Sequence, residues 1–311
     1  MYEWTAIIPM ILLHELPMLV HAGVLKGAPL LWATLGGAFS ERSGIINIGL
    51  EGMMLAGAFA AVAASGLSGN PWAGLMAGAV CGGLFGLVHA LVCIRWKADQ
   101  IVSGMGINLF SLGITGFLLF QIFKARGNSP EVPKIPTIQG WSDIPILSDL
   151  FFPLSPLHIL LFLMIGFTIF VFYQTAFGLR LRACGEDPRV VKAAGVRASL
   201  YRYGAVGISG VMAGLGGVQL ALCDVSQFSQ GMTNGRGFVA LAALICSGWR
   251  PGRAALICFL FGCAEALGER LQGAFPLLPS RAYLALPFVL ALIVLSLRKT
   301  QSRPPRALGK V

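Results

Sequence analysis

The sequence predicts an all-α protein that crosses a membrane several times. Of its 311 residues, 56% are hydrophobic and only 12% are charged, whereas a soluble domain carries roughly 25% charged residues. Several apolar runs reach the ~20 residues that a helix needs to cross a bilayer. The alternating polar and apolar residues of an outer-membrane barrel are absent. We therefore expect a polytopic integral membrane protein with about 8–10 transmembrane helices in a single transmembrane domain over residues 1–311.

The first helical half is expected over residues 18–123. Residues 1–16 are predicted to form an interfacial or extra segment, because the apolar run Trp4–Leu13 is too short to cross a membrane. The predicted spans of this half are 18–39, Ile45–Ser65, Trp72–Ile94 and a fourth that Asp99 and Gln100 open and that runs to Phe123. The third span carries Gly74, Gly78, Gly82 and Gly86 at every fourth position. Such a ridge lets another helix approach closely.

A polar, proline-rich stretch separates the halves, and we predict an ordered external loop over residues 124–153. The second half, 203–298, follows a further span at Leu154–Ala176. Its predicted helices are Tyr203–Leu222, a short broken or tilted helix at Gly237–Ser247, and crossings at Ala254–Gln272 and Tyr283–Leu297. Residues 299–311 form a basic tail that we expect on the cytoplasmic side.

The basic loop 178–201 is predicted to contain a short surface helix. Asp187 followed by Pro188 is a good helix start, with an N-cap acceptor and a proline in the first turn. The helix should end near Gly195, so it is too short to cross the membrane. Basic residues gather in cytoplasmic loops, which places this loop inside and accounts for the net charge of +10 without a nucleic-acid partner.

Two hairpins suggest an inverted repeat. Ile45–Ile94 and Arg236–Gln272 would run in opposite senses across the membrane, and an offset of 180 residues aligns several small residues and prolines between them. The aligned pairs are Gly57 with Gly237, Ala60 with Ala240, Ala63 with Ala243, Pro71 with Pro251 and Gly82 with Gly262. Inverted repeats of this kind are typical of membrane transporters.

The stretch Ser40–Met54 is unusually polar for its surroundings. Asn47 and Glu51 are four residues apart, so a helix that contained both would present them on one face. That face must meet protein or water, because lipid cannot satisfy it. The topology places the stretch near the inner side. We therefore interpret it first as a gate and helix junction, and second as a substrate contact.

Polar residues within or beside apolar spans are candidate gate or pathway residues. They are Glu41, Asn47, Glu51, Asp99, Gln100, Asn108, Asp224, Gln227 and Asn234. Two alternatives stay open at this point. Asn47 and Glu51 could lock helices to each other, and Asp99 and Arg42 could be simple interfacial charges.

Three segments resemble the permease subunits of bacterial ABC importers of the branched-chain amino acid, ribose and nucleoside group. They are the run from Ser40 to Gly57, the run from Gly178 to Pro188 with Ala193, Ala194 and Gly195, and the run from Gly235 to Ala243. The resemblance covers nearly the whole chain in order. The amino-acid sequence of Ser40–Gly52 looks closest to the nucleoside-type branch, because branched-chain amino acid members more often carry Asn-Phe-Ala-His-Gly at positions 47–51.

The resemblance implies a transmembrane permease that forms the translocation pathway for a small polar solute. Nucleosides are the substrate expected here, with simple sugars or branched-chain amino acids as the alternative. It implies that the loop contains a coupling helix for an ATPase subunit, with matching positions at Gly185, Glu186, Asp187, Pro188, Ala193, Ala194 and Gly195. The implied partners are a cytoplasmic ATPase, a second identical or different permease, an extracytoplasmic substrate-binding protein and membrane lipid. The implied location is the bacterial inner membrane, multi-pass, with the C-terminus in the cytoplasm.

The residues argue against an enzyme. The chain lacks a phosphate-binding loop, since Gly231–Arg236 has neither the lysine nor the spacing. No nucleophile arrangement or metal-ligand spacing occurs, and we expect no cofactor. ATP hydrolysis would belong to a separate chain. An alternative of another class, an ion-coupled secondary transporter, would need no ATPase.

Overall fold

A computed structural model describes residues 16–138, 154–274, 279, 283, 285–297 and 304–310 of the chain. Most of the predicted segment 1–16 and the second part of the predicted external loop, 139–153, lie outside these residues. So do residues 299–303 of the predicted tail.

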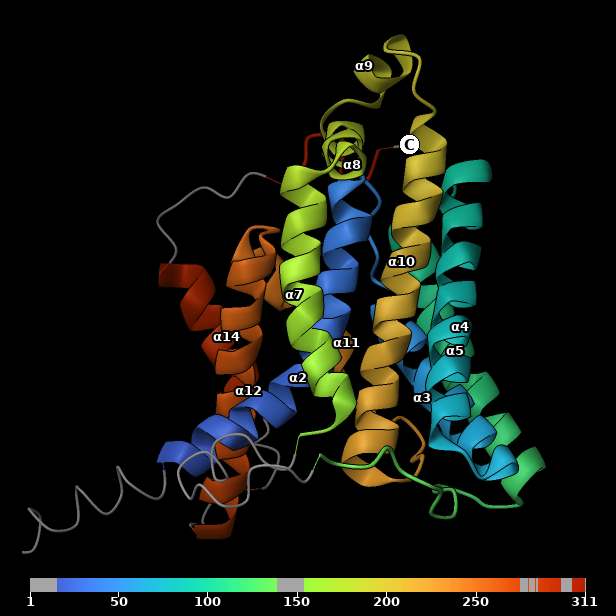
Figure 1. The fold of residues 1–311 in the computed structure, drawn as a ribbon, viewed down its shortest axis with the longest axis vertical. Helices are drawn as coiled ribbons and strands as arrows, with labels where there is room; N and C mark the ends of the chain where they lie inside the picture. Colours follow the sequence, from blue (N-terminus) through green and yellow to red (C-terminus); the bar gives the residue numbers. More distant parts are fainter. Residues whose placement is uncertain are drawn as a thin grey trace, which may run out of the picture.

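The described residues form a helix bundle (Figure 1). Its helices are α2 (Leu16–Arg42), α3 (Leu50–Ser68), α4 (Pro71–Ala90), α5 (Gln100–Phe123), α7 (Pro156–Gln174), α8 (Ala176–Glu186), α9 (Pro188–Ala193), α10 (Ala198–Val218), α11 (Arg236–Ser247), α12 (Pro251–Ala274) and α14 (Leu286–Leu297). The π-helical segments Leu91–Arg95 and Gln219–Val225 continue α4 and α10.

Six helices of the described part of the chain are long and apolar enough to cross a membrane: α2, α3, α4, α5, α7 and α10. Their exposed surfaces are rich in large apolar side chains, such as Val80, Leu109 and Phe170, which suits contact with lipid rather than water. The chain is therefore a polytopic all-α membrane protein. Helix α11 is apolar but only 12 residues long, which confirms the predicted short helix.

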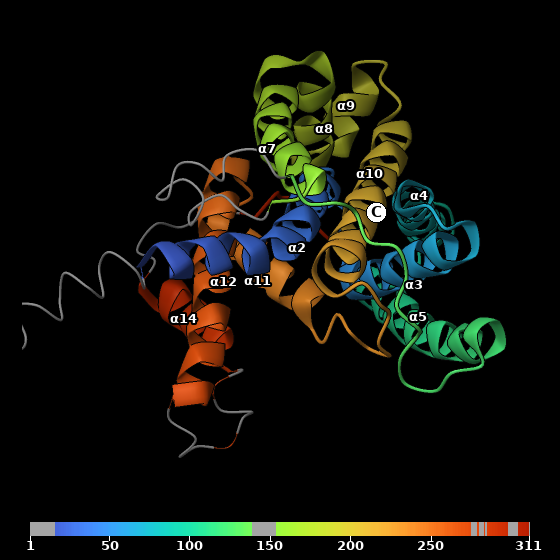
Figure 2. The same ribbon diagram turned by 60° about the horizontal axis from the view of Figure 1, so that its bottom comes forward.

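Helices α2 and α10 occupy the centre of the bundle, and the other long helices flank them. Both ribbon views place α3, α4 and α5 on one side and α12 with α14 on the other (Figures 1 and 2). Helices α8 and α9 lie at one end, which we call the α8 end (Figure 1). Residues 124–138 lie across the opposite end of the bundle (Figure 1). They form backbone hydrogen bonds with the segment at the end of α10, for example from Val132 N–H to Ser226 O at 2.9 Å.

Two seams between helices are built on glycine. In the α4–α10 seam, a Cβ atom on Gly82 would lie 2.7 Å from Gly214 Cα, and one on Gly86 would lie 3.0 Å from Gly210 Cα. The predicted ridge is confirmed, because such separations leave no room for a side chain. In the α2–α12 seam, a Cβ atom on Gly262 would lie 2.6 Å from the backbone nitrogen of Gly27.

The two seams join two groups of three consecutive helices, which we call triplets: α2–α3–α4 and α10–α11–α12. The first helix of each triplet packs on the third helix of the other. Helices α3 and α11 begin beside each other, since a Cβ atom on Gly237 would lie 2.5 Å from Glu51 Cα, and then run to opposite ends of the bundle. This arrangement agrees with the inverted repeat that the hairpins suggest.

Two predicted boundaries are wrong. Helix α3 begins at Leu50, so the residues from 43 to 49 are non-helical and Asn47 does not share a helix face with Glu51. The reason is local: Gly44 adopts a φ of +96°, and Ser40 O accepts hydrogen bonds from the backbone nitrogens of Ser43 and Ile45. Both features end a helix. Helix α10 begins at Ala198, ahead of the predicted Tyr203.

Candidate gate and coupling loop

The 43–49 connection is irregular backbone that lies inside a membrane protein. Most of its residues are buried, with Ser43, Ile45 and Asn47 fully so. Buried N–H and C=O groups need hydrogen-bond partners, and lipid offers none. The polar side chains around the connection therefore have a structural role before any other.

Three side chains from neighbouring helices meet that need. His89 of α4 contacts Ile46 O through Nε2 at 2.9 Å, and Gln100 of α5 accepts from Ile46 N–H at 2.7 Å. Asn108 of α5 donates to Ile48 O at 3.1 Å and accepts from Gly52 N–H, in the first turn of α3, at 2.8 Å. Two of the predicted pathway residues, Gln100 and Asn108, thus hold the connection in place.

Asn47 and Gln100 keep unused hydrogen-bonding capacity. Asn47 Nδ2 donates to Ser209 Oγ of α10 at 2.9 Å, while Asn47 Oδ1 and Gln100 Nε2 are buried and lack a partner among the described residues. Buried unsatisfied polar atoms are uncommon and call for a physical reason. Among the nine predicted gate or pathway residues, these two amides are the ones left with such an atom.

Glu51 lies where the N-termini of α3 and α11 face each other. Its Oε1 accepts from Thr233 Oγ1 at 2.7 Å and Gly235 N–H at 2.8 Å, and its Oε2 accepts from Gly237 N–H at 2.7 Å. Helix N-termini expose unpaired N–H groups and carry roughly half a positive charge each. The Glu51 carboxylate, carried by the first turn of α3, therefore occupies an anion site at the N-terminus of α11.

The other end of α11 is held by Glu41 and Arg42, the last residues of α2. The indole Nε1 of Trp249 donates to Glu41 Oε2. Arg42 donates to Trp249 O from Nε at 3.2 Å and from Nη2 at 3.1 Å. Residues of the polar stretch Ser40–Met54 thus bind both ends of one short helix, which supports the interpretation as a helix junction.

Helix α9 projects from the α8 end beyond the other helices (Figure 1). The predicted start is confirmed: Asp187 is the N-cap and accepts from Arg189 N–H at 2.8 Å, and Pro188 opens the helix. Gly195 ends it with a φ of +76°. Val190 is 65% exposed while Val191 is 5% exposed, so α9 anchors one valine and presents the other.

The seven predicted coupling residues lie at the two ends of α9 and directly before and after it. Gly185 is buried at the end of α8, where a Cβ atom would lie 3.3 Å from Gly44 N and closer still to Arg42 O. Glu186, Ala193 and Ala194 are exposed. The loop therefore has a fixed base next to the 43–49 connection and an exposed tip.

The remaining candidate residues do not join the junction. Asp99 is exposed and caps α5 by accepting from Ile101 N–H at 2.8 Å and Val102 N–H at 2.9 Å, so capping accounts for it. Asp224, Gln227 and Asn234 lie in or after the π-helical end of α10.

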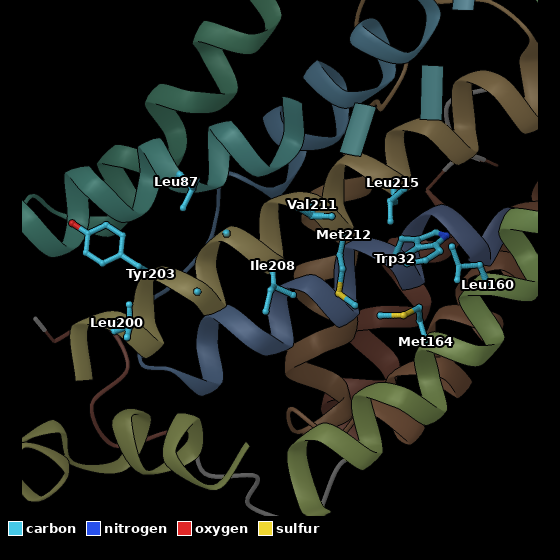
Figure 3. A pocket seen from close by; sticks show the side chains of 12 residues that line it. Trp32, Leu87, Leu160, Met164, Leu200, Tyr203, Ile208, Val211, Met212 and Leu215 are labelled. Atoms are coloured by element: carbon cyan, nitrogen blue, oxygen red, sulfur yellow. The ribbon is translucent and has the colours of Figure 1, made fainter. Parts of the chain in front are cut away.

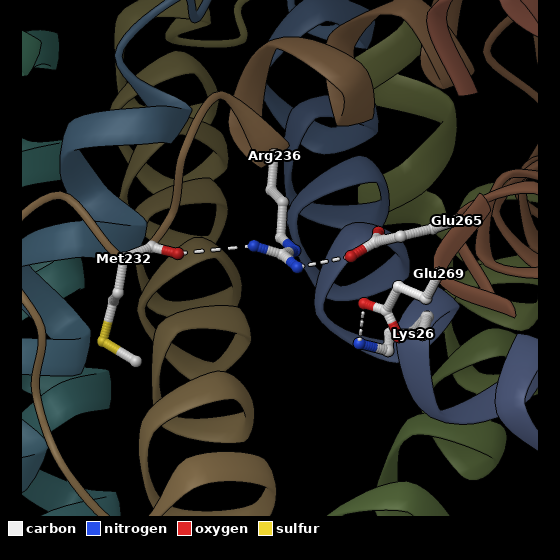
Figure 4. Close-up of polar contacts among 5 residues, drawn as sticks. All are labelled: Lys26, Met232, Arg236, Glu265 and Glu269. Atoms are coloured by element: carbon white, nitrogen blue, oxygen red, sulfur yellow. Dashed lines mark hydrogen bonds and ion pairs between the residues drawn. The ribbon is translucent and has the colours of Figure 1, made fainter. Parts of the chain in front are cut away.

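A polar pocket of about 540 Å³ lies beside the far end of α10, and Asp224 lines it with Lys26, His158 and Arg236. Arg236 pairs with Glu265 of α12 and donates to Met232 O at 3.3 Å, while Lys26 Nζ lies 2.6 Å from Glu269 Oε1 (Figure 4). These contacts tie α2, α11 and α12 together. We call this the outer pocket.

A second hollow, an apolar groove of about 490 Å³, lies between α4, α7 and α10 (Figure 3). Its lining is almost entirely aliphatic, aromatic or methionine side chains, including Trp32, Met164 and Met212. A polar solute in this groove would lose hydrogen bonds to water without replacing them. The groove suits lipid chains better than a solute pathway.

Sequence reasoning missed several residues of the junction. His89, Ser209, Thr233, Trp249 and Arg202 all bond to the polar stretch or its surroundings. Each lies in a different span from its partner, so no local spacing could reveal the pair. A polar residue within an apolar run was the available signal, and it applied to His89 and Ser209. Among the described residues, no group of three or more His, Cys, Asp or Glu could hold a metal ion.

Comparison with known proteins places the chain in a family. Residues 19–297 match the model described as branched-chain amino acid transport system / permease component. The chain is 37% identical to the guanosine ABC transporter permease protein NupQ of Bacillus subtilis, covering 94% of this chain and 96% of the relative. It is 35% identical to the nucleoside ABC transporter permease protein NupC of Lactococcus lactis, covering 95% and 96%. No solved structure matches.

A putative glucose ABC transporter permease protein, TsgC13 of Haloferax volcanii, is 35% identical over 86% of this chain and 82% of the relative. Each of the three organisms also has a second matching permease that is more distant. These are NupP of Bacillus subtilis at 24%, NupB of Lactococcus lactis at 24% and TsgB13 of Haloferax volcanii at 22% identity.

Proposed function

The chain belongs to the family of permease components of branched-chain amino acid transport systems, and we propose that it imports nucleosides. It is a transmembrane permease subunit of an ABC importer and not an enzyme. The observation that carries the substrate proposal is the similarity over almost the full length to permeases named for guanosine and for nucleosides. The relative named for glucose keeps simple sugars as the second candidate.

Two features of the site support a neutral, polar solute of nucleoside size. The outer pocket, at about 540 Å³, falls within the ~300–1,000 Å³ typical of small-molecule sites. At the facing N-termini of α3 and α11, the Glu51 carboxylate already fills the anion site. Discontinuous helices in transporters often bind an anionic substrate group at such N-termini. With Glu51 in place, that binding mode is closed to a substrate anion.

We assign the α8 end to the cytoplasm. Basic residues on its helices and loops include Arg180, Arg189, Lys192, Arg250 and Lys310, as expected for the inner face of a bacterial membrane. In this orientation α9 presents Val190 and its neighbours to a cytoplasmic ATPase. The fixed base of the loop at Gly185 would carry movement of the ATPase to α2 and α10 as a rigid-body shift.

Two further partners are proposed. An extracytoplasmic binding protein would deliver the substrate at the end with the outer pocket. A second permease would complete the pathway, and its sequence should differ from this one, because each of the three organisms compared has one permease close to this chain and one distant from it.

Among the predicted gate residues, the unsatisfied amides of Asn47 and Gln100 are our candidates for direct contact with substrate. Glu41, Glu51 and Asn108 are assigned to the helix junction that forms the inner gate. Asp224, Gln227 and Asn234 are assigned to the outer entrance. Asp99 is assigned to capping.

Uptake tests the substrate proposal. Deletion of the gene should abolish ATP-dependent uptake of labelled guanosine, and a plasmid copy should restore it. Competition with unlabelled purine nucleosides, glucose or leucine separates the candidates, and only the nucleosides should compete. Unchanged guanosine uptake after deletion would refute a nucleoside substrate.

Co-purification tests the coupling loop. Val190→Asp and Gly195→Arg should weaken retention of the ATPase and stop transport, because the first puts a charge on the exposed face of α9 and the second puts a side chain where φ is positive. Leu67→Asp, at an apolar position that is also largely exposed but lies at the opposite end of the bundle, is the matched control. Intact transport in both α9 variants would contradict the coupling role.

A further inference from the structure

The residues from 304 to 310 form a second connection between the coupling loop and the gate. Although they come last in the chain, they lie beside α8 (Figure 1), and Pro305 and Ala307 are buried there. Within the segment, Leu308 N–H donates to Pro305 O and Lys310 N–H donates to Ala307 O, both at 3.0 Å. The segment is therefore a folded turn rather than a trailing end.

This turn binds three separate elements through its backbone. Ala307 N–H donates to Gly185 O, at the base of the coupling loop, at 2.8 Å. Gly309 N–H donates to Gly44 O, in the 43–49 connection, at 3.1 Å. Lys310 O accepts from Arg202 Nη2, in the first turns of α10, at 3.3 Å.

Arg202 makes the third contact significant. It is only 5% exposed, and its Nε donates to Ser43 O at 3.1 Å. A buried guanidinium needs acceptors for its donors, and the acceptors here are backbone carbonyls from the 43–49 connection and from the 304–310 turn. The same cation thus joins α10, the gate connection and the turn.

The space around the turn leaves little freedom for relative sliding. A Cβ atom on Gly44 would lie 3.1 Å from Arg202 Nη2 and 3.3 Å from Ala307 O. The buried side of the coupling loop, the gate connection and the turn therefore meet almost backbone to backbone. A shift of Gly185 would be passed to Gly44 both directly and through residues 307 to 309.

We propose that residues 304–310 act as a strap that couples movement of the α8–α9 loop to the inner gate at residues 43–49. The strap rests on the proposed role of α9 as the ATPase contact. It positions the gate and does not touch the solute. Without the strap the ATPase still docks on α9 and hydrolyses ATP, but hydrolysis opens the gate less effectively, because only the direct contact between Gly185 and the 43–49 connection remains.

The test uses the full importer in proteoliposomes, with the ATPase, both permeases and the loaded binding protein, and measures ATP hydrolysis and labelled guanosine uptake together. One variant ends after Arg303. A second, Ala307→Pro, removes the N–H that bonds to Gly185 O and also restrains the backbone at positions 306 and 307. Ala307→Ser keeps that N–H, and Arg306→Ala changes an exposed side chain of the same turn.

In the truncated and proline variants, we expect the ATPase to co-purify normally and uptake per ATP hydrolysed to fall by about tenfold, as loss of one or two such hydrogen bonds at the gate would produce. Ala307→Ser and Arg306→Ala should behave like the unmodified protein. Uptake per ATP within about twofold of normal in both strap variants would overturn the proposal, as would loss of the ATPase from the complex.

The α9 variants separate this outcome from failure of the proposed function. If Val190→Asp leaves transport intact, the coupling role of α9 is wrong, and the strap loses its premise. If Val190→Asp stops transport while truncation changes nothing, α9 couples the ATPase without a strap.

Discussion

The two ends of α11 are held by the same polar stretch in different ways. At its N-terminus, one carboxylate, Glu51, accepts three hydrogen bonds, two of them from backbone N–H groups. Two residues hold its C-terminal side, where Arg42 donates to a backbone carbonyl and Glu41 accepts from the indole of Trp249. The carboxylate of Glu51 thus meets the positive end of the helix, whereas a cation and a carboxyl group together hold the C-terminal side.

The two ends of α11 differ in the hydrogen bonds that each would lose if its partner residue were removed. Without Glu51, buried backbone donors at the N-terminus lack a partner, and no other side chain is seen to replace it among the described residues. Without Arg42, Trp249 O loses two donors from one residue, while Glu41 still binds the indole. We therefore expect the N-terminal end to be the more sensitive to substitution, and three predictions test the comparison.

The largest effect is expected for Glu51→Ala. It leaves Gly235 N–H and Gly237 N–H unsatisfied at the junction, and we expect a loss of about 3 kcal/mol in stability. Glu51→Gln should lose less, because its amide oxygen can still accept from Thr233 and Gly235. The measurement is the temperature at which the detergent-solubilised protein loses its monodisperse peak, together with guanosine uptake. If the alanine variant and the unmodified protein lost this peak at the same temperature, Glu51 would not stabilise the N-terminus of α11.

An intermediate effect is expected for Arg42→Gln. It removes the charge and at least one of the two bonds to Trp249 O, for a loss of about 1–2 kcal/mol. A double-mutant cycle with Glu51→Gln sharpens the comparison. Because the two residues bind opposite ends of α11, their effects should add within ~0.5 kcal/mol. Strong coupling would instead show that α11 responds as one rigid piece.

The smallest effect is expected for Glu41→Gln. The amide oxygen of glutamine can accept from Trp249 Nε1 as the carboxylate does, so stability should change by less than about 1 kcal/mol. Trp249→Phe removes the donor instead and leaves Glu41 buried without this partner, so it should destabilise more than Glu41→Gln. The opposite order would show that the charge of Glu41 matters beyond this bond.

The sequence predicted the helices well because long apolar runs allow few alternatives in a membrane. It also predicted the start and end of α9, since Asp187, Pro188 and Gly195 determine local backbone geometry. It failed at Asn47, where a glycine with positive φ and two serine side chains stop a pattern that otherwise suits a helix. The roles of His89, Trp249 and the 304–310 turn depend on contacts across more than 40 residues of chain, which spacing cannot show.

The exchange of helices between the two triplets has a consequence for how the protein is made. The glycine face of α2 at Gly23 and Gly27 has its partner in Cys258 and Gly262 of α12, so more than 200 residues are synthesised before the seam can close. Contacts at such long sequence separation slow folding. During this interval the small residues of α2 face lipid or the insertion machinery. The first triplet therefore enters the membrane before α12, the packing partner of α2, has been synthesised.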